Sequence, residues 1–154
     1  MIRKDKQKNS STSPLDVSVI VCTKNSANTI VECLKSIREN HPKEIILVDA
    51  NSTDETKELA RPYATKIIQD PGRGLAVARN YGLEQVKGRY VCNVGPDNVL
   101  PPGTLEKCIE YLKQNSHVGV STQTVVKNPD KSYFSYAINP VSYTHLTLPT
   151  ICSV

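Results

Sequence analysis

Tryptophan, long apolar runs and closely spaced cysteine pairs are all missing from this chain of 154 residues. No apolar run approaches the roughly 18 residues that a membrane-spanning helix needs. The first residues are charged and then polar, which is unlike a signal peptide. The five cysteines, at positions 22, 33, 92, 108 and 152, include no Cys-x-x-Cys pair. These absences predict a cytoplasmic protein without a disulfide framework, associated with a membrane only through segments downstream of this sequence.

Aromatic residues are scarce as well, and the excess of positive charge is concentrated at one end. The chain has one Phe and seven Tyr, and its net charge is +4. Residues 1–8 hold four Lys or Arg and one Asp, which supplies +3 and leaves +1 (15 basic minus 14 acidic) for the rest. Proteins that bind single-stranded nucleic acid combine basic grooves with stacking aromatics. We therefore expect no nucleic-acid partner, and we predict a disordered basic and polar tail over residues 1–15.

Charged side chains are also missing from residues 141–154, VSYTHLTLPTICSV, although 22% of the whole chain is charged. VSYTHLTLPT resembles the in-frame translation of a transposon adapter used in shotgun sequencing libraries. That adapter requires Ser, Pro, Thr or Ala just before it, and residue 140 is Pro. We predict that residues 141–154 are not native, that the natural protein continues beyond about Asn139, and that residues 16–140 form a partial domain. The alternative is an ordinary threonine-rich edge strand.

Apolar periodicity indicates a regular alternation of strands and helices. Continuous apolar runs predict strands at 17–22, 44–49, 66–70, 89–94 and 117–126, buried on both faces as in a parallel sheet. Helical patterns occupy 28–40, 54–61, 74–87 and 101–115. Three of these helices are expected to bury the following side chains: Ile30, Cys33, Leu34 and Ile37; Leu75, Ala78, Leu83 and Val86; Leu105, Cys108, Ile109 and Leu112. The predicted fold is α/β, a doubly wound, mainly parallel Rossmann-like sheet that is incomplete at its C-terminus.

Polar clusters follow four consecutive predicted strands. They are TKNS (23–26), DANSTD (49–54), DPGRG (70–74), which leads to Arg79, and GPDN (95–98). The carboxyl ends of parallel strands meet at one edge of the sheet, where such folds bind ligands. Carboxylates, amides and an arginine there suit a nucleoside diphosphate. The sequence has no GxGxxG after the first strand and no GxxxxGK[ST], which argues against a dinucleotide fold or a P-loop NTPase.

These motifs together resemble one family. VSVIVCTKN, IILVDANSTDET, GRGLAVARNYGLEQVKGRYV and NVGPDNVLPPGTLEK, in this order and spacing, are similar to the nucleotide-sugar domain of family-2 glycosyltransferases with the GT-A fold, over about residues 17–126. The resemblance implies that Thr23, Asn25 and Asn51 belong to the nucleotide-sugar pocket, and that Asp49 bonds a uracil or guanine ring or the ribose. It further implies that Arg79 lies over the nucleotide, with Gly74 allowing close approach of the backbone.

The resemblance also implies a divalent cation, manganese or magnesium, held by Asp97 of an Asp-x-Asp element. Here the sequence departs from the family, because Gly95 stands where the first Asp is expected. Losing one carboxylate is expected to weaken or retune metal binding rather than abolish it. A second departure is Ala50-Asn51 in place of a more usual Asp-Gly. Asn tolerates left-handed backbone angles, so this loop is expected to accept the change.

The implied reaction transfers a sugar from a nucleoside-diphosphate donor to a hydroxyl of a saccharide, lipid-carrier or protein acceptor. Residues 127–140 supply only Asp130 as an acid, so the catalytic base is expected beyond this sequence. One alternative is a nucleotide-binding module without catalysis. Another is a response-regulator domain, in which Asp70 would imitate the phospho-acceptor. A structural role as a cap or turn residue of the second helix competes with a ligand role for Asp49, and it is the favoured expectation for Asp54.

Overall fold

The computed structural model describes residues 13–115, 119–120 and 152–153. Four strands alternate with four helices along residues 15–115: β1 (Leu15–Thr23), α1 (Ile30–Arg38), β2 (Pro42–Asp49), α2 (Thr56–Ala60), β3 (Lys66–Gln69), α3 (Leu75–Leu83), β4 (Tyr90–Val94) and α4 (Thr104–Asn115). Two short strands follow, β5 (Gly119–Val120) and β6 (Cys152–Ser153). The predicted alternation is therefore confirmed over the first eight elements.

The sheet has the strand order β3-β2-β1-β4-β6-β5. β1 lies between β2 and β4 and is parallel to both, and β2 is parallel to β3. The chain thus builds outward from β1 to β3 and then returns to place β4 on the other side of β1. This reversal of strand order is the place where doubly wound sheets leave a crevice at their carboxyl edge. The predicted mainly parallel, Rossmann-like α/β fold is confirmed.

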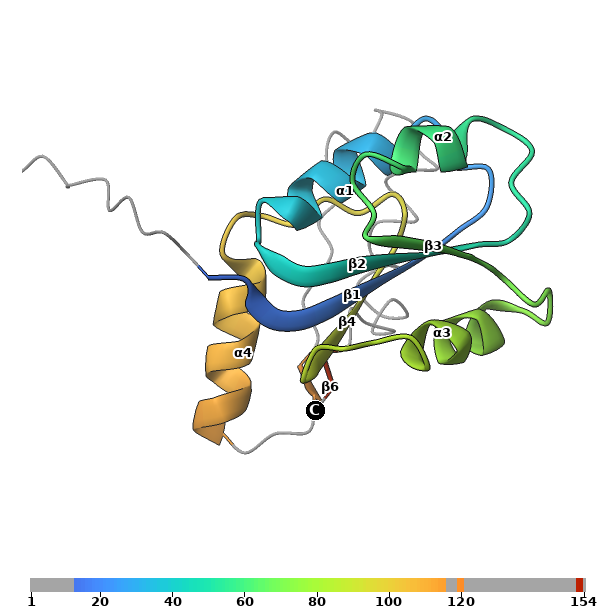
Figure 1. Ribbon diagram of the computed structural model, residues 1–154. Coiled ribbons are helices and arrows are strands. Elements are labelled where there is room, and N and C mark those ends of the chain that lie inside the picture. The colour runs from blue at the N-terminus through green and yellow to red at the C-terminus, as the bar shows by residue number, and fades with distance from the viewer. Residues whose placement is uncertain (1–12, 116–118, 121–151, 154) are drawn as a thin grey trace, which may run out of the picture.

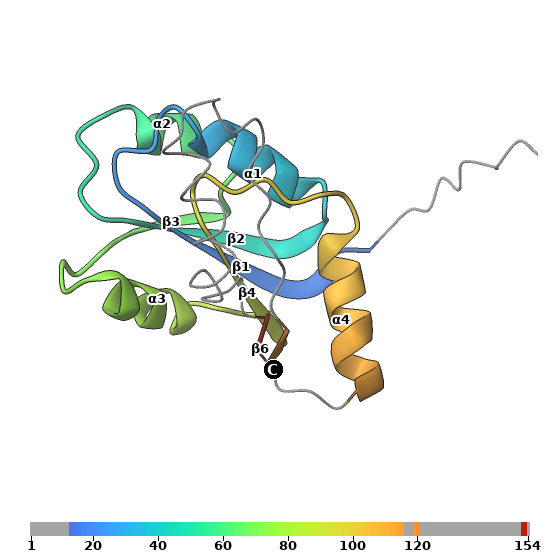
Figure 2. The ribbon, with the colours of Figure 1, turned by 180° about the vertical axis from the view of Figure 1, so that it is seen from behind.

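The two faces of the sheet carry two separate cores because successive strand side chains alternate between faces. Val19, Val21 and Leu47 belong to the larger core, which also contains the buried side chains of α1 and α4. Ile20 and Val48 belong to the smaller core, which contains Ala78 of α3. Figures 1 and 2 show α1 and α2 on one side of the sheet and α3 on the other. Both faces of β1 and β2 are therefore covered, as their continuous apolar runs predict.

Helix burial follows the predicted pattern in α1 and α4 but not in α3. All four predicted inward side chains of α1, and all four of α4, are buried. In α3, Ala78 is buried as predicted, whereas Leu75 and Leu83 are 54% and 39% exposed. The reason is Gly82, where an added Cβ would lie only 2.8 Å from Cγ2 of Ile20. α3 packs on the sheet through its small residues Ala78 and Gly82, so the prediction for Leu75 and Leu83 is wrong.

Two other expectations about strands need correction or completion. β3 lies at the edge of the sheet, and its residues Ile67 and Ile68 are only partly buried, so this strand is not enclosed on both faces. The predicted strand at 117–126 is described only at Gly119–Val120, which pairs antiparallel with β6. β6 falls within the segment that we predict to be non-native, and it pairs antiparallel with β4. Residues 1–12 and most of 121–154 lie outside the described residues.

The amino edge of the sheet is closed by a buried hydrogen-bond cluster. The carboxylate of Glu44, on β2, accepts hydrogen bonds from the hydroxyl of Ser18 and from the backbone N–H of Lys87. The Ser18 hydroxyl in turn accepts the N–H of Gly88 at 2.8 Å. Ser18 and Glu44 are both buried. The cluster fixes the entry into β4 against β1 and β2.

No helix among the described residues is long and apolar enough to cross a membrane.

Candidate functional site at the carboxyl edge of the sheet

A pocket of about 510 Å³ lies at the carboxyl edge, between the ends of β1 and β2 and the segment that joins β3 to α3. This volume lies within the range of small-molecule sites. Its wall combines apolar side chains from the smaller core with polar groups from three loops. The lining residues are Cys22, Thr23, Lys24, Val48, Ala50, Asn51, Asp70, Gly72, Gly74, Leu75 and Ala78. An apolar wall with a few polar groups is suited to a planar ring that carries hydrogen-bonding edges.

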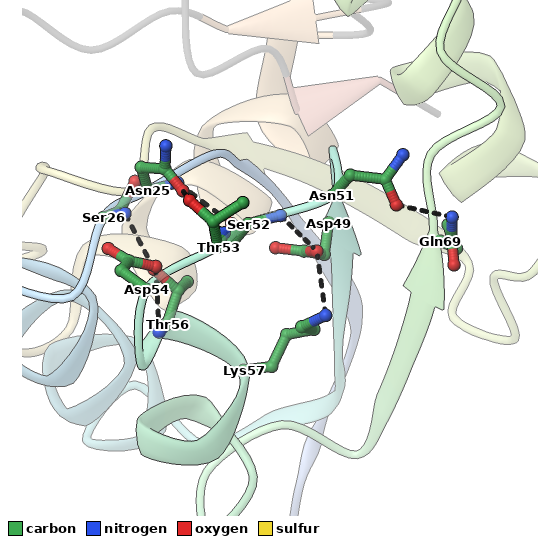
Figure 3. A network of polar contacts seen from close by, with 10 residues as sticks. All are labelled: Asn25, Ser26, Asp49, Asn51, Ser52, Thr53, Asp54, Thr56, Lys57 and Gln69. Atoms are coloured by element: carbon green, nitrogen blue, oxygen red, sulfur yellow. Dashed lines mark hydrogen bonds and ion pairs between the residues drawn. The ribbon is translucent and has the colours of Figure 1, made fainter.

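The loops after β1 and β2 are joined to one another by hydrogen bonds (Figure 3). The side-chain carbonyl of Asn25 accepts the N–H of Thr53 at 2.9 Å, and the hydroxyl of Ser52 accepts the N–H of Asn25 at 2.9 Å. Asn25 has a φ of 49°, a left-handed value that Asn tolerates. Asn25 does not line the pocket, although the resemblance implies a pocket role. Its observed contacts hold two loops of the site in a fixed relation.

Asp54 strengthens the same junction. Its carboxylate accepts hydrogen bonds from the hydroxyl and N–H of Thr56, at the start of α2, and from the N–H of Ala27 at 3.0 Å. The hydrogen bond from the Thr56 hydroxyl is the largest cause that holds the pKa of Asp54 below its ordinary value. Thr56 also accepts the N–H of Ser26 at 2.8 Å. The favoured expectation for Asp54, a structural role at the start of the second helix, is confirmed.

Asp49 ends β2 and is 2% exposed. One carboxylate oxygen accepts the N–H of Ser52 at 3.0 Å and lies 3.9 Å from the ammonium of Lys57. The other oxygen, Oδ1, is buried without a hydrogen-bond partner among the described residues. Asp49 is absent from the pocket wall, and its contacts lie toward α2 (Figure 3). Asp49 thus contacts Ser52 and Lys57 rather than the pocket wall, and its role toward a base stays a prediction.

Thr23, Asn51 and Gly74 line the pocket, as the resemblance implies. The Thr23 hydroxyl is a buried group without a hydrogen-bond partner in the described part of the chain. Asn51 has a φ of 54°, in line with the expected tolerance of this loop, and its side chain accepts a hydrogen bond from Gln69 at 2.6 Å. Figure 3 shows Asn51 directed toward Gln69 and away from the Asp49 carboxylate. Gly74 has a φ of 94°, which side chains rarely adopt, and precedes the first turn of α3.

The charges of Asp70, which follows β3, and of Arg79 on α3 act on Cys22 in the pocket wall. Burial raises the pKa of the Cys22 thiol to about 11; the positive charge of Arg79 opposes this shift and the negative charge of Asp70 adds to it. Asp70 is 8% exposed, and its Oδ1 accepts the N–H of Gly72 at 2.8 Å. Arg79 thus lies close enough to the pocket to act on a lining residue. The position over the nucleotide that the resemblance implies for Arg79 stays a prediction.

The segment that carries Asp97 is a hydrogen-bonded turn. The N–H of Asn98 donates to the carbonyl of Gly95 at 3.1 Å, with Pro96 at the second position, where proline favours a β-turn. The thiol of Cys33 on α1 donates to the same carbonyl at 3.3 Å. Burial, followed by the charge of Asp97, raises the pKa of Cys33 to about 12. The Cys33 thiol thus holds this turn against α1, whereas Asp97 is exposed.

Among the described residues, no group of three or more His, Cys, Asp or Glu side chains is placed to hold a metal ion. Asp97 is a single exposed carboxylate, which suits a cation that takes its other ligands from water and phosphate oxygens, as magnesium does. The donor set therefore fits a cation that binds together with a diphosphate. An added Cβ at Gly95 would lie 2.9 Å from Oδ1 of Asp97, so a second carboxylate at position 95 would require the Asp97 side chain to move.

The polar strand ends predict a site at the carboxyl edge of the sheet, where the structure has the pocket, but they do not single out Cys22 in its wall or Lys57 beside Asp49. Cys22 ends an apolar run, where a cysteine is commonly a buried free thiol. Lys57 sits on a short helix where a charged side chain is usually only a solvated residue. The one available signal for Cys22 was its position directly before Thr23 at a strand end.

Comparison with known proteins identifies the family. The family model described as Glycosyl transferase family 2 matches residues 18–151. The glycosyltransferase AglE of Haloferax volcanii is 39% identical over 91 residues, which are 53% of this chain and 30% of that protein. The chain spans less than half of the length of the curated relatives that it matches.

Solved structures agree with this match. The mannosyltransferase PcManGT from Pyrobaculum calidifontis is 29% identical with a TM-score of 0.62, and the match covers 84% of this chain and 42% of that one. TarS from S. aureus, in complex with UDP-GlcNAc, is 27% identical with a TM-score of 0.57, and the match covers 75% and 38%. This excludes the response-regulator alternative. The chain belongs to glycosyl transferase family 2 and carries its GT-A, Rossmann-like fold.

Proposed function

We propose that this chain is the donor-binding part of a glycosyltransferase, which transfers a sugar from a nucleoside diphosphate to an acceptor hydroxyl. The observation that carries the proposal is the pocket at the carboxyl edge, with Thr23, Asn51 and Gly74 in its wall and Arg79 close to it. PcManGT was solved with GDP-Man and TarS with UDP-GlcNAc, which supports a nucleotide-sugar donor here. The acceptor is a saccharide, a lipid carrier or a protein.

We assign each part of the site a task in donor binding. The apolar wall of Val48 and Ala78 excludes water from one face of the base. Arg79 provides a positive charge beside the pocket, where it can pair with a diphosphate or a base carbonyl. The hydrogen bonds between Asn25 and the loop after β2 keep the wall in place when the nucleotide enters. The transferred sugar passes through an oxocarbenium-like state, so a fixed leaving group lowers the cost of reaching it.

Asp97 is the residue that we propose to hold a divalent cation, manganese or magnesium, against the donor diphosphate. PcManGT was solved with Mn²⁺, which supports the choice of ion. When bound, such an ion offsets the negative charge that develops on the leaving diphosphate. With Gly95 in place of a second carboxylate, cation affinity is expected to depend strongly on the nucleotide. Because only Asp130 is available in 127–140, the catalytic base is proposed to lie beyond this sequence.

The test of this proposal is calorimetric titration of the full chain with UDP-sugar and GDP-sugar donors, with and without manganese. We expect binding of one donor class, tightened by manganese, together with slow or no turnover. Asp97→Ala is expected to remove the manganese-dependent part of the affinity and to leave the rest. Unchanged affinity of Asp97→Ala in manganese contradicts the metal assignment. Failure of the wild-type chain to bind any nucleoside diphosphate or its sugar contradicts donor binding itself.

The non-native origin of residues 141–154 is a second, independent proposal. Long-read sequencing of the source locus across codon 140 is expected to show a reading frame that continues from Pro140 into further sequence with an acidic base. A genomic reading frame that encodes VSYTHLTLPTICSV and then stops contradicts it, and favours a binding module without catalysis. The cytoplasmic location likewise remains a prediction, which cell fractionation of the longer protein tests.

A further inference from the structure

Two aspartates lie at the carboxyl ends of neighbouring strands, Asp49 as the last residue of β2 and Asp70 directly after β3, and they face opposite sides of the sheet. Asp49 pairs in register with Gln69, the last residue of β3, so Asp70 lies one residue beyond the partner of Asp49. Side chains alternate between faces along a strand. Asp49 therefore shares its face with Leu47 and the larger core, whereas Asp70 shares its face with Ile68 and the smaller core. The backbone hydrogen bond from Asp70 N–H to the carbonyl of Asp49, at 2.8 Å, continues the strand pairing to this point.

The pocket lies on the face of Asp70. Val48 and Ala78 belong both to the smaller core and to the pocket wall, and Asp70 lines the same wall. Resting on the proposed function, we propose that Asp70 is the residue that selects the base of the donor nucleotide. It accepts a hydrogen bond from the ring N–H of uracil or guanine. Asp49 holds the loop after β2 instead.

The surroundings of Asp70 leave it able to accept such a bond. The side chain is 8% exposed, and the N–H of Gly72 fixes Oδ1 at 2.8 Å. Among the described residues, Gly72 is the only hydrogen-bond donor that contacts this carboxylate. A buried carboxylate with unused acceptor capacity at a pocket wall gains strongly from an N–H donor of a ligand. Asp49 differs, since its Oδ2 is occupied by Ser52 and Lys57 and its Oδ1 is enclosed.

The positive charge of Arg79 is expected to increase the selectivity of the site for one class of base. Asp70 lines the pocket wall, and the charges of Asp70 and Arg79 both act on the Cys22 thiol of that wall. Uracil and guanine present a ring N–H directly beside a carbonyl, which matches an acceptor next to a donor. Adenine and cytosine present an unprotonated ring nitrogen there, whose lone pair faces the carboxylate unfavourably. A site built to bond an N–H rejects an analogue that lacks it because its own polar group is then left unpaired.

The test compares four nucleoside diphosphates, UDP, GDP, CDP and ADP, by calorimetric titration of the full chain in magnesium buffer. The variants are Asp70→Asn, which keeps an acceptor for Gly72, and Asp70→Glu, which displaces the carboxylate by one methylene. Asp49→Asn is the competing assignment. Asp16→Asn, an exposed aspartate paired with Lys43 near the amino edge, is the matched control for the same chemical change. Circular dichroism and thermal melting confirm that each variant is folded.

We expect the wild type to bind UDP or GDP at least tenfold more tightly than CDP and ADP; which of the two binds identifies the base. Asp70→Asn and Asp70→Glu are expected to lose about tenfold to a hundredfold in affinity for that nucleotide and little for CDP and ADP. Asp16→Asn is expected to match the wild type. Retained discrimination in both Asp70 variants overturns the inference, and loss of discrimination in Asp49→Asn alone reassigns the base to Asp49. In either case nucleotide binding by the wild type leaves the proposed function standing. Binding of none of the four nucleotides overturns both.

Discussion

Two buried carboxylates at opposite edges of one sheet have different surroundings. At the amino edge, Glu44 is 7% exposed and its Oε1 accepts hydrogen bonds from Ser18 and Lys87. At the carboxyl edge, Asp70 is 8% exposed but lines a pocket of about 510 Å³ and has one donor among the described residues. Equal burial thus accompanies different roles. Glu44 joins three segments of the fold, whereas Asp70 is left to meet a ligand.

The loops show the same contrast. The segment that enters β4 is fixed by Ser18 and Glu44 to the interior of the sheet. The loops at the carboxyl edge are fixed to one another, through Asn25 and Asp54, and keep polar atoms such as the Thr23 hydroxyl without partners in the described part of the chain. Unsatisfied buried polar groups are costly, and they concentrate where a ligand or water completes them. Stability and binding should therefore respond differently to mutations at the two edges.

The largest expected effect on stability is at the amino edge. Glu44→Ala removes the acceptor of two hydrogen bonds: the buried Ser18 hydroxyl loses this acceptor, and the N–H of Lys87 keeps only its 3.2 Å hydrogen bond to Ser18. The free energy of unfolding should fall by about 3 kcal/mol. Urea denaturation measures it, with exposed Glu39→Ala as the control. Nucleotide affinity below the unfolding transition is expected to stay unchanged. A loss of affinity with little change in stability would reverse the roles assigned to the two edges.

A smaller loss is expected where α3 meets the sheet. An added Cβ at Gly82 would lie 2.8 Å from Ile20 and 3.2 Å from Val48. Overpacking of this kind costs about 1–3 kcal/mol, whereas helix propensity favours Ala over Gly by about 1 kcal/mol. Gly82→Ala should therefore lower the free energy of unfolding by about 1 kcal/mol in urea denaturation. Exposed Ala76→Gly calibrates the propensity term in the same helix. A stabilised Gly82→Ala variant would show that α3 does not rest on the sheet through this glycine.

The effect at Lys57 should be smaller still. Its ammonium lies 3.9 Å from Asp49 but is 41% exposed, so solvent screens most of the interaction. Lys57→Met should lower the free energy of unfolding by less than about 1 kcal/mol and leave the choice of nucleotide unchanged. Thermal melting measures the change in stability, and calorimetric titration measures the affinity for each nucleotide. Lys24→Met, which changes a residue of the pocket wall, is the contrasting variant. Loss of base selectivity in Lys57→Met would indicate that Asp49, and not Asp70, recognises the base of the nucleotide.

The smallest effects are shifts in the pKa of Cys22, which is about 11. Asp70→Asn removes a negative charge beside the thiol and should lower that pKa, whereas Arg79→Gln removes a positive charge and should raise it. In the wild type, the rate of Cys22 alkylation should rise with pH until the pH passes about 11. Mass spectrometry of the peptide that contains Cys22 measures the rate. Shifts in the same direction for both variants would contradict the placement of Cys22 between the two charges.

The sequence predicts the fold well because its strongest signals are apolar and periodic. The inward face of α1, with Ile30 and Leu34, repeats at helical spacing and is buried as predicted. The spacing of apolar residues does not reveal which face of α3 contacts the sheet. That face meets the sheet at Gly82, which has no side chain.

The site is predicted less completely than the fold, and for a different reason. Polar residues at strand ends predict the edge of the sheet at which the structure has its pocket. They do not tell Asp49 from Asp70, because the direction of each side chain depends on a register between β2 and β3 that only the structure gives. The position of Arg79 over a nucleotide stays a prediction of the resemblance; the structure shows only that its charge acts on Cys22 in the pocket wall. Asn25 does not line the pocket; its side chain accepts a hydrogen bond from the N–H of Thr53, 28 positions along the chain.

The central claim is that a nucleoside diphosphate occupies the pocket at the carboxyl edge. The measurement that tests it most directly is protection of Cys22, which lines that pocket, from a small alkylating reagent at pH 9. Saturating UDP or GDP is expected to slow the modification of Cys22 at least several-fold and to leave Cys108, on α4, unchanged. Equal rates for Cys22 with and without a nucleotide that is shown by calorimetry to bind would place the nucleotide elsewhere and contradict the account.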